Sequence, residues 1–155
     1  MRKVRIGIWG FGAMGTGMAN MILKKDGMEI VSVCSRSTAG KSIYDVLDIE
    51  RGDRNEVIIN GNYEEAFTEK SCDVVLLATD SFTKKAFDKI IYLLEKKINV
   101  ISTAEQMAYP QADDPDVAKK MDEVAKENGV SAVSYTHLTL PTIRQLCRSR
   151  WSPYH

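Results

Sequence analysis

Residues 6–15 read IGIWGFGAMG, so an apolar run leads directly into three glycines, Gly10, Gly12 and Gly15. Glycines at the GxGxxG spacing are common in loops, and the spacing alone is a weak signal. Here a predicted strand precedes the glycines and a predicted helix follows them, inside a strand–helix–strand unit of about thirty residues. This context favours a turn that binds the pyrophosphate of a dinucleotide over a glycine-rich loop without a ligand.

Each glycine has a separate physical role in such a turn. Gly10 allows the chain to turn tightly, Gly12 lets the backbone approach a pyrophosphate, and Gly15 lets the helix pack closely on the strand. The free N–H groups and the dipole at the start of the helix then favour the phosphates. The loop residues expected to bind the cofactor are Gly10, Phe11, Gly12, Ala13, Met14 and Gly15.

The rest of the chain alternates short apolar segments with longer segments of helical periodicity. The predicted strands are residues 3–9, 29–34, 56–59, 73–78, 98–102 and a segment that begins at 130. The predicted helices are residues 13–25, 40–49, 63–69, 82–96 and 115–128. The apolar face predicted for the first helix consists of Met14, Met18, Met21 and Ile22. Because strands that alternate with helices pair in parallel through crossovers, the expected fold is α/β, a doubly wound, mostly parallel sheet of the Rossmann type.

The end of the second predicted strand indicates which dinucleotide is bound. NAD-specific sites place an acidic residue there, about 20 residues after the glycines, to bind the ribose hydroxyls. This sequence instead has Ser35, Arg36 and Ser37 at that place. A guanidinium pairs with a 2′-phosphate and serine hydroxyls donate to it, so NADP is the favoured cofactor, with NAD also tolerated. The alternative is that Arg36 is a solvated charge that stacks on the adenine.

Two later strands are followed by polar residues at the edge where such sheets bind ligands. Thr79 and Asp80 follow the strand 73–78 and are expected to face the cofactor, although Asp80 also suits the cap of the next helix. Glu105 follows the strand 98–102 and is a candidate catalytic carboxylate. On pattern alone, Glu105 fits a surface glutamate equally well.

Composition excludes several classes of protein. The chain has 155 residues with 21 basic and 21 acidic side chains, and the absence of basic clusters argues against nucleic acid as a partner. No apolar run of about 18 residues predicts a membrane span, and a cytoplasmic protein is expected. The three cysteines lie far apart, so neither a disulfide framework nor a metal site is predicted, and Cys34 and Cys72 are expected to be buried apolar residues.

The last 23 residues, 133–155, break the pattern of the sheet. They contain both histidines of the chain, His137 and His155, several arginines and no acidic residue. The string VSYTHLTLPT within them resembles the translation of a transposon-end adapter used in sequencing libraries. We therefore expect residues 1–132 to form the NAD(P)-binding domain and residues 133–155 to be a non-native tail. The alternative is a genuine C-terminal arm that docks on the sheet.

Four segments of residues 1–132 resemble the family of 2,4-diaminopentanoate dehydrogenases and related amine dehydrogenases, within a wider group of dihydrodipicolinate reductase-like proteins. They are GFGAMG, the SRS after the second strand, ATDSF and, most specifically, VISTAEQMAYP. The resemblance implies oxidative deamination of a small diamine or amino acid with hydride transfer to NAD(P), in a homo-oligomeric enzyme. It also implies that Glu105 handles the amine during imine formation.

In the family a second domain supplies most of the substrate pocket and the dimer contacts, and it would begin where the tail stands. The resemblance therefore implies a cofactor domain whose second domain is missing and which is inactive by itself. Two other functions remain open at this point. One is a dihydrodipicolinate reductase-like enzyme of lysine biosynthesis, and the other is a nucleotide-binding or sensor domain without catalysis.

Overall fold

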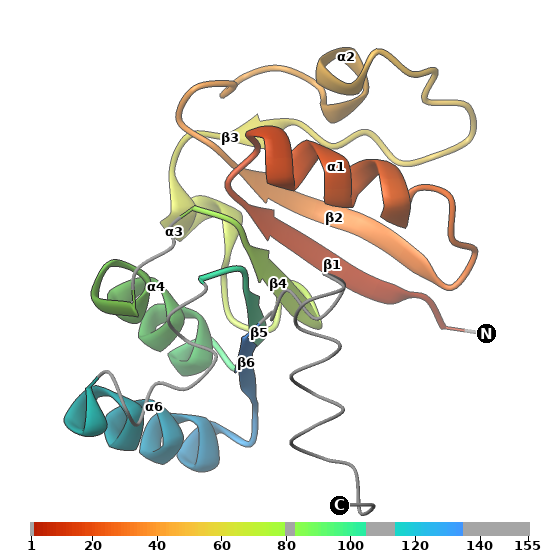
Figure 1. The fold of residues 1–155 in the computed structure, drawn as a ribbon. Coiled ribbons are helices and arrows are strands. Elements are labelled where there is room, and N and C mark those ends of the chain that lie inside the picture. Colours follow the sequence, from red (N-terminus) through yellow and green to blue (C-terminus); the bar gives the residue numbers. More distant parts are fainter. Residues whose placement is uncertain (1, 80–82, 105–113, 135–155) are drawn as a thin grey trace, which may run out of the picture.

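The computed structural model describes residues 2–79, 83–104 and 114–134 of the chain (Figure 1). Its strands are β1 (Val4–Trp9), β2 (Met28–Cys34), β3 (Ile59–Asn60), β4 (Val74–Leu77), β5 (Asn99–Ser102) and β6 (Ala132–Ser134). Its helices are α1 (Ala13–Ile22), α2 (Ile43–Leu47), α3 (Tyr63–Ala66), α4 (Thr83–Glu95) and α6 (Pro115–Asn128). Strands and helices alternate, as the sequence predicts.

The six strands form one sheet in the order β3-β2-β1-β4-β5-β6, and every neighbouring pair is parallel. The order reverses between β1 and β4, which are neighbours in space although two strands separate them in the chain. In open α/β sheets ligands bind at this reversal, beyond the carboxyl ends of the strands. The predicted doubly wound sheet of the Rossmann type is confirmed.

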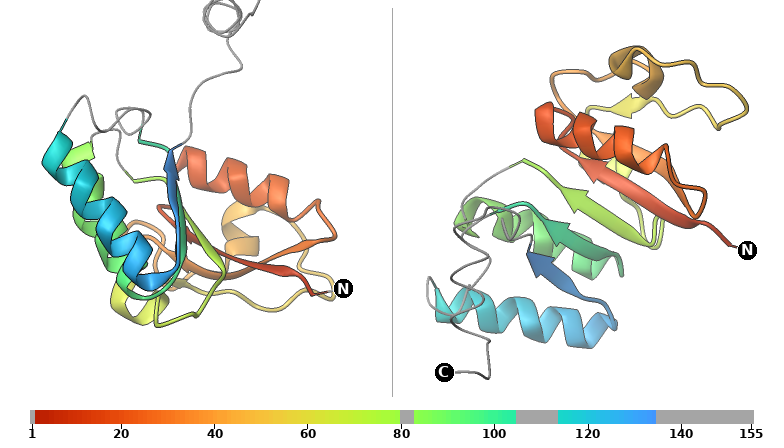
Figure 2. Two further views of the ribbon diagram at one scale, coloured as in Figure 1. Left: turned by 90° about the horizontal axis from the view of Figure 1, so that it is seen from below. Right: turned by 45° about the vertical axis from the view of Figure 1, so that its right-hand side comes forward.

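Helices cover the two faces of the sheet and create two separate cores (Figure 2). Because successive side chains of a strand point to opposite faces, β1 contributes to both. Ile6 and Ile8 belong to the core under α1 and α2, while Trp9 belongs to the core under α3, α4 and α6. The sheet is therefore buried on both sides, which explains why its central strands are almost continuously apolar.

The buried face of α1 differs from the predicted one. Met14 is 50% exposed and Met21 is 66% exposed, whereas the buried positions of the helix are Gly15, Ala19 and Ile22. Small residues occupy two of these positions because α1 lies very close to the loop and strand beneath it. The helix also ends at Ile22, three residues before the predicted end, and the lysines that follow are exposed.

Other boundaries also differ from prediction, among them those of β3 and β6. Strand β3 begins at Ile59 instead of residue 56, because Ile58 forms an antiparallel bridge with Ser42. Strand β6 extends to Ser134, where Val133 pairs with Ile101 of β5. Val133 and Ser134, which the sequence analysis assigned to the tail, therefore pair within the sheet, and residues 135–155 lie outside the described part of the chain.

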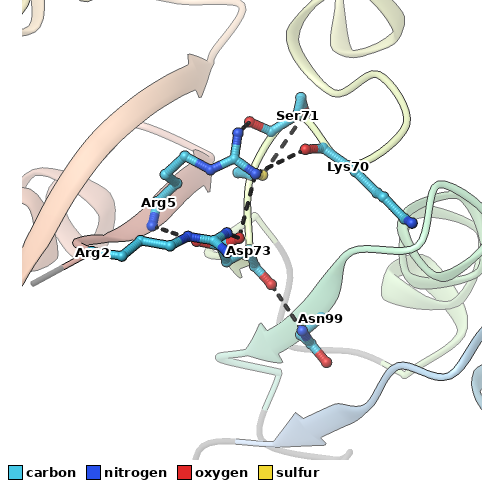
Figure 3. Close-up of polar contacts among 7 residues, drawn as sticks. Arg2, Arg5, Lys70, Ser71, Asp73 and Asn99 are labelled. Carbon is cyan, nitrogen blue, oxygen red and sulfur yellow. Dashed lines mark hydrogen bonds and ion pairs between the residues drawn. The ribbon is translucent and has the colours of Figure 1, made fainter.

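An ionic network ties β1 to β4 at the end of the sheet opposite the predicted site (Figure 3). The Asp73 carboxylate accepts hydrogen bonds from the backbone N–H of Arg5 at 2.9 Å and from the guanidinium of Arg2 at 2.7 Å. Arg5 also reaches Asp73 with its guanidinium at 3.3 Å. The bond from the backbone of Arg5, reinforced by the two guanidinium groups, holds the pKa of Asp73 below its usual value.

Replacing Asp73 with alanine is expected to lower the free energy of unfolding by about 1–2 kcal/mol at pH 7, because a backbone N–H loses its acceptor. A carboxyl whose folded-state pKa is lowered stabilises the fold above the unfolded pKa, near pH 4, and loses that effect as the pH falls further. The gap between parent and Asp73→Ala should therefore narrow at pH 3. Urea unfolding at pH 7 and pH 3 measures the difference in the free energy of unfolding between the two proteins. If this difference is the same at both pH values, the charge of Asp73 is not the source of the stabilisation.

No helix in the described ranges is long and apolar enough to cross a membrane. Cys34 and Cys72 are buried and unpaired, as predicted. Burial raises the pKa of the Cys72 thiol to about 11. Both cysteines therefore act as small core residues.

Candidate cofactor site

A cleft of about 900 Å³ lies at the carboxyl ends of β1, β2, β3 and β4. Backbone hydrogen bonds join the residues that leave these strands. The Gly10 N–H donates to the Cys34 carbonyl at 2.8 Å, the Ser35 N–H donates to Asn60, and the Ala78 N–H donates to Trp9. The floor of the cleft is therefore hydrogen-bonded backbone, and the cleft volume suits a ligand of cofactor size.

The backbone at Gly10 and Gly15 shows why the first turn needs glycine at these positions. Gly10 has a φ of +99°, and a Cβ there would lie 2.6 Å from the carbonyl oxygen of Ala78. A Cβ at Gly15 would lie 1.9 Å from the carbonyl oxygen of Gly10. The tight turn and the close helix packing predicted from the motif are both present.

Gly12 lies in a different environment from the other two glycines of the motif. A Cβ built at Gly12 would meet nothing within 4 Å, so the fold itself does not require glycine there. Gly12 is the N-cap of α1 and carries no capping side chain, and the first turn of α1 holds no acidic residue. The start of α1 thus offers uncapped N–H groups and the positive end of the helix dipole to the cleft.

The remaining loop residues predicted to bind cofactor are not equivalent. Phe11 lines the cleft but is 2% exposed, and its side chain belongs to the core under α1 and α2. Ala13 and Met14 are exposed on the first turn of α1 and do not line the cleft. Their contact with a cofactor stays a prediction.

Ser35, Arg36 and Ser37 line the cleft together at the end of β2. Ser35 is buried, and its hydroxyl oxygen lies 3.3 Å from that of Ser37. Arg36 is exposed and forms no ion pair with any residue in the described ranges. Burial raises the pKa of the neighbouring Cys34 thiol, and Arg36 partly offsets this rise. The end of β2 is thus polar and cationic, without a nucleophilic thiolate.

On the other side of the reversal, Thr79 follows β4 and lines the cleft. Its hydroxyl accepts a hydrogen bond from the Nζ of Lys89 in α4 at 2.9 Å. Asp80 and Glu105, both predicted as site residues, lie outside the described residues. The cleft therefore carries two cationic side chains, Arg36 and Lys89, on opposite sides of the first turn.

The part of the cleft that comes from helices and from the last side chain of β1 was not predicted from the sequence. The lining residues that were not predicted include Trp9, Gly61, Tyr63, Asp88, Lys89 and Tyr92. Tyr63 begins α3 and Tyr92 lies in α4, so only the packing of these helices brings them to the strand ends. The sequence signal that could have indicated this part of the cleft is the spacing of Asp88 and Tyr92. They lie four residues apart and therefore on one face of α4.

The family described as "Semialdehyde dehydrogenase, NAD binding domain" matches residues 5–135. A curated relative, 2,4-diaminopentanoate dehydrogenase from Acetoanaerobium sticklandii, is 59% identical over 134 residues, which are 86% of this chain. The match covers 38% of that relative, so the chain spans about two fifths of its length.

Solved structures of dehydrogenases share the fold. Amine dehydrogenase from Mycobacterium smegmatis is 26% identical with a TM-score of 0.76, over 83% of this chain and 38% of that one. An engineered D-amino acid dehydrogenase bound to NADP+ has a TM-score of 0.64 over 96% of this chain and 41% of that one. At 16% identity this second structure supports the fold alone.

The matched residues include all the described strand residues except Val4, together with the glycine turn and the cleft at the strand ends. They form a domain that binds NAD(P) in an oxidoreductase. The chain belongs to the semialdehyde dehydrogenase NAD-binding domain family.

Proposed function

We propose that this chain is the NADP-binding domain of an amine dehydrogenase that oxidatively deaminates a small diamine or amino acid. The observation that carries the proposal is the 59% identity to 2,4-diaminopentanoate dehydrogenase. This identity favours an amine substrate over the reaction of a dihydrodipicolinate reductase-like enzyme and over a sensor without catalysis. By the resemblance to amine dehydrogenases we propose that the full-length enzyme is homo-oligomeric, and by the sequence composition that it is cytoplasmic.

The described residues fit a dinucleotide. Open space beside Gly12 admits a pyrophosphate, and the uncapped start of α1 favours its charge. Ser35, Arg36 and Ser37 hold the adenosine ribose and its 2′-phosphate. Thr79 and Lys89 lie across the turn, toward the strands that follow β1 in the sheet. When bound, the nicotinamide accepts a hydride from the carbon that bears the amine, while this chain orients the cofactor.

The preference for NADP rests on the charges at the end of β2. The tetrapeptide from Cys34 to Ser37 contains no carboxylate that would repel a 2′-phosphate. Arg36 is exposed, lines the cleft and has no ion-pair partner among the described residues, so its guanidinium is available to a phosphate. A guanidinium forms bidentate, charge-assisted hydrogen bonds with such a group.

Arg36→Asp is expected to reverse the order of affinities, so that NADH binds more tightly than NADPH. The substitution removes one charge-assisted contact, worth about 1.5–3 kcal/mol, and adds repulsion. NADPH affinity should fall roughly tenfold to a hundredfold. Fluorescence titration of both cofactors measures this change.

Lys24→Asp is the matched control, because it changes the net charge equally at an exposed position after the far end of α1. It should leave the ratio of the two affinities unchanged. If Arg36→Asp retains the parent preference for NADPH, the side chain of Arg36 does not bind the 2′-phosphate.

We propose that Glu105 is the catalytic carboxylate of the full-length enzyme. In the sequence it comes three residues after the end of β5, and ligands bind beyond the carboxyl ends of the strands in such sheets. Residues 1–132 contain no histidine to carry a proton. A carboxylate can hold the substrate ammonium and accept its proton as the iminium forms and water attacks. We also propose that the tail that follows β6 is non-native and has no part in this function.

A further inference from the structure

Helix α1 carries a second apolar side besides the face that it buries on the sheet. Met14, Met18 and Met21 follow one another at spacings of four and three residues, so they lie along one flank of the helix, here called the methionine flank. Helix α1 contains no charged residue, whereas α4 and α6 each contain several. A helix that is apolar on more than its buried face is typical of one that is covered from a second direction.

The methionine flank is directed toward the half of the sheet formed by β4, β5 and β6. Leu23, at the end of α1, lies on the opposite flank and packs in the core that contains Ile43 of α2. Figure 2 shows α2 on one side of α1 and the strands β4, β5 and β6 on the other. Because one flank of α1 is directed to α2, the methionine flank is directed to β4 and the strands beyond it.

The cover on the α1 side of the sheet ends before the β6 edge. Val100 of β5 is buried in the core under α4 and α6, so its neighbour Ile101 points to the opposite face of the sheet. Ile101 is 37% exposed, and Val133, which pairs with it from β6, is 51% exposed. Leu76, which pairs with Ile101 from β4, is half-buried. Among residues 2–79, 83–104 and 114–134, no helix lies over these three side chains (Figure 2).

The methionine flank together with Leu76, Ile101 and Val133 forms one continuous surface, here called the open face. Its three strands contain no charged residue. Neighbouring strands lie about 4.8 Å apart, so the distance from β4 to β6 is about 10 Å, which is close to the diameter of one helix. The open face therefore has the width and the apolar character that suit the packing of a single helix.

The described residues end at the open face itself. Ser134, the last residue of β6, directly follows Val133. The match covers only 38% of the Acetoanaerobium sticklandii relative, so most of that protein lies outside it. A segment that continues from β6 meets the open face at an effective concentration of about millimolar, an advantage that a separate partner does not have. The length and the starting point of the remaining chain thus favour an occupant from the same polypeptide.

We propose that a helix from the part of the full-length enzyme that follows β6 packs its apolar side on the open face. This inference rests on the proposed function, because it takes the chain to be one part of a longer dehydrogenase. The cofactor domain is then completed by a segment from outside residues 1–134. The remaining part of the enzyme is thereby fixed to the helix that begins at the glycine turn.

Thiol labelling tests the proposal in two proteins, the 155-residue chain with Cys147→Ser and a chimaera in which residues 1–134 continue into the remaining part of the relative. Cys34 and Cys72 are buried in both. Val133→Cys and Met21→Cys place a thiol on the open face, and peptide mass spectrometry reads each site. Both thiols should react with a maleimide at least about tenfold more slowly in the chimaera than in the chain, because a covered site reacts only when its cover opens.

Ile58→Cys is the matched control, since Ile58 is 53% exposed and lies next to β3, at the other edge of the sheet. Its labelling rate should be equal in the two proteins. Equal rates at Val133→Cys overturn the inference. Protection of Val133→Cys that appears in the 155-residue chain as its concentration rises assigns the open face to a second copy and also overturns it. A protected chimaera that does not oxidise an amine contradicts the proposed function and supports the docking.

Discussion

Gly15→Ala should lower the free energy of unfolding by about 3 kcal/mol or more, the largest stability effect expected of any single methyl group in the domain. The new Cβ would lie 1.9 Å from the Gly10 carbonyl oxygen, which is backbone and cannot rotate away as a side chain would. Either α1 must move from β1 or the turn must open. A loss of this size lowers Tm by roughly 6–12 °C in a protein of this length.

Gly17→Ala is the matched control for the same substitution in the same helix. A Cβ at Gly17 meets nothing within 4 Å, and the residue is exposed. Alanine should raise stability there by about 0.5–1 kcal/mol, because glycine is a poor helix former. Thermal unfolding followed by circular dichroism separates the two variants. Equal Tm values for Gly15→Ala and the parent would contradict the close approach of α1 to the glycine turn.

Glu105→Gln should reduce kcat by about 10²–10⁴-fold, the range typical of a lost general acid–base group. The measurement needs a substrate pocket, so residues 1–134 are joined to the remaining part of the Acetoanaerobium sticklandii relative. The amide keeps the size of the side chain but neither holds an ammonium by charge nor accepts its proton. The Kd for NADPH should stay at the parent value, because the proposed role concerns the substrate alone.

Glu127→Gln is a suitable control in the same chimaeric protein. Glu127 is exposed in α6, and the change removes the same charge at a residue that does not line the cleft. Its kcat should equal that of the parent. A parent-like kcat for Glu105→Gln would show that this residue is a surface acid, as the sequence pattern alone equally allowed.

The sheet and its glycine turn were predictable because they depend on local patterns. The central strands lie in short, largely apolar runs. Gly10 and Gly15 have geometries that other residues cannot adopt without displacing backbone. The face of α1 was predicted wrongly, because hydrophobicity favoured methionines at positions such as Met14. The actual contact demanded small side chains, which a hydrophobicity pattern does not reveal.

The three aromatic side chains that line the cleft could not be predicted for a different reason. Trp9, Tyr63 and Tyr92 come from β1, α3 and α4, which meet only in the folded sheet. In the sequence Trp9 reads as an ordinary strand residue and Tyr92 as part of an amphipathic helix. Residues that bind through backbone or a local motif can thus be found from sequence, whereas surfaces assembled from several elements require the packing.

Calorimetric titration of the folded chain with NADPH, alongside Gly12→Val, tests the central claim that the turn between β1 and α1 binds the cofactor. Valine at Gly12 meets no protein atom near its Cβ, so the fold should persist, while the side chain occupies the space proposed for the pyrophosphate. The account predicts saturable one-to-one binding to the parent and binding at least about tenfold weaker to the variant. Equal NADPH affinities of the two folded proteins, or no binding to the parent, would contradict it.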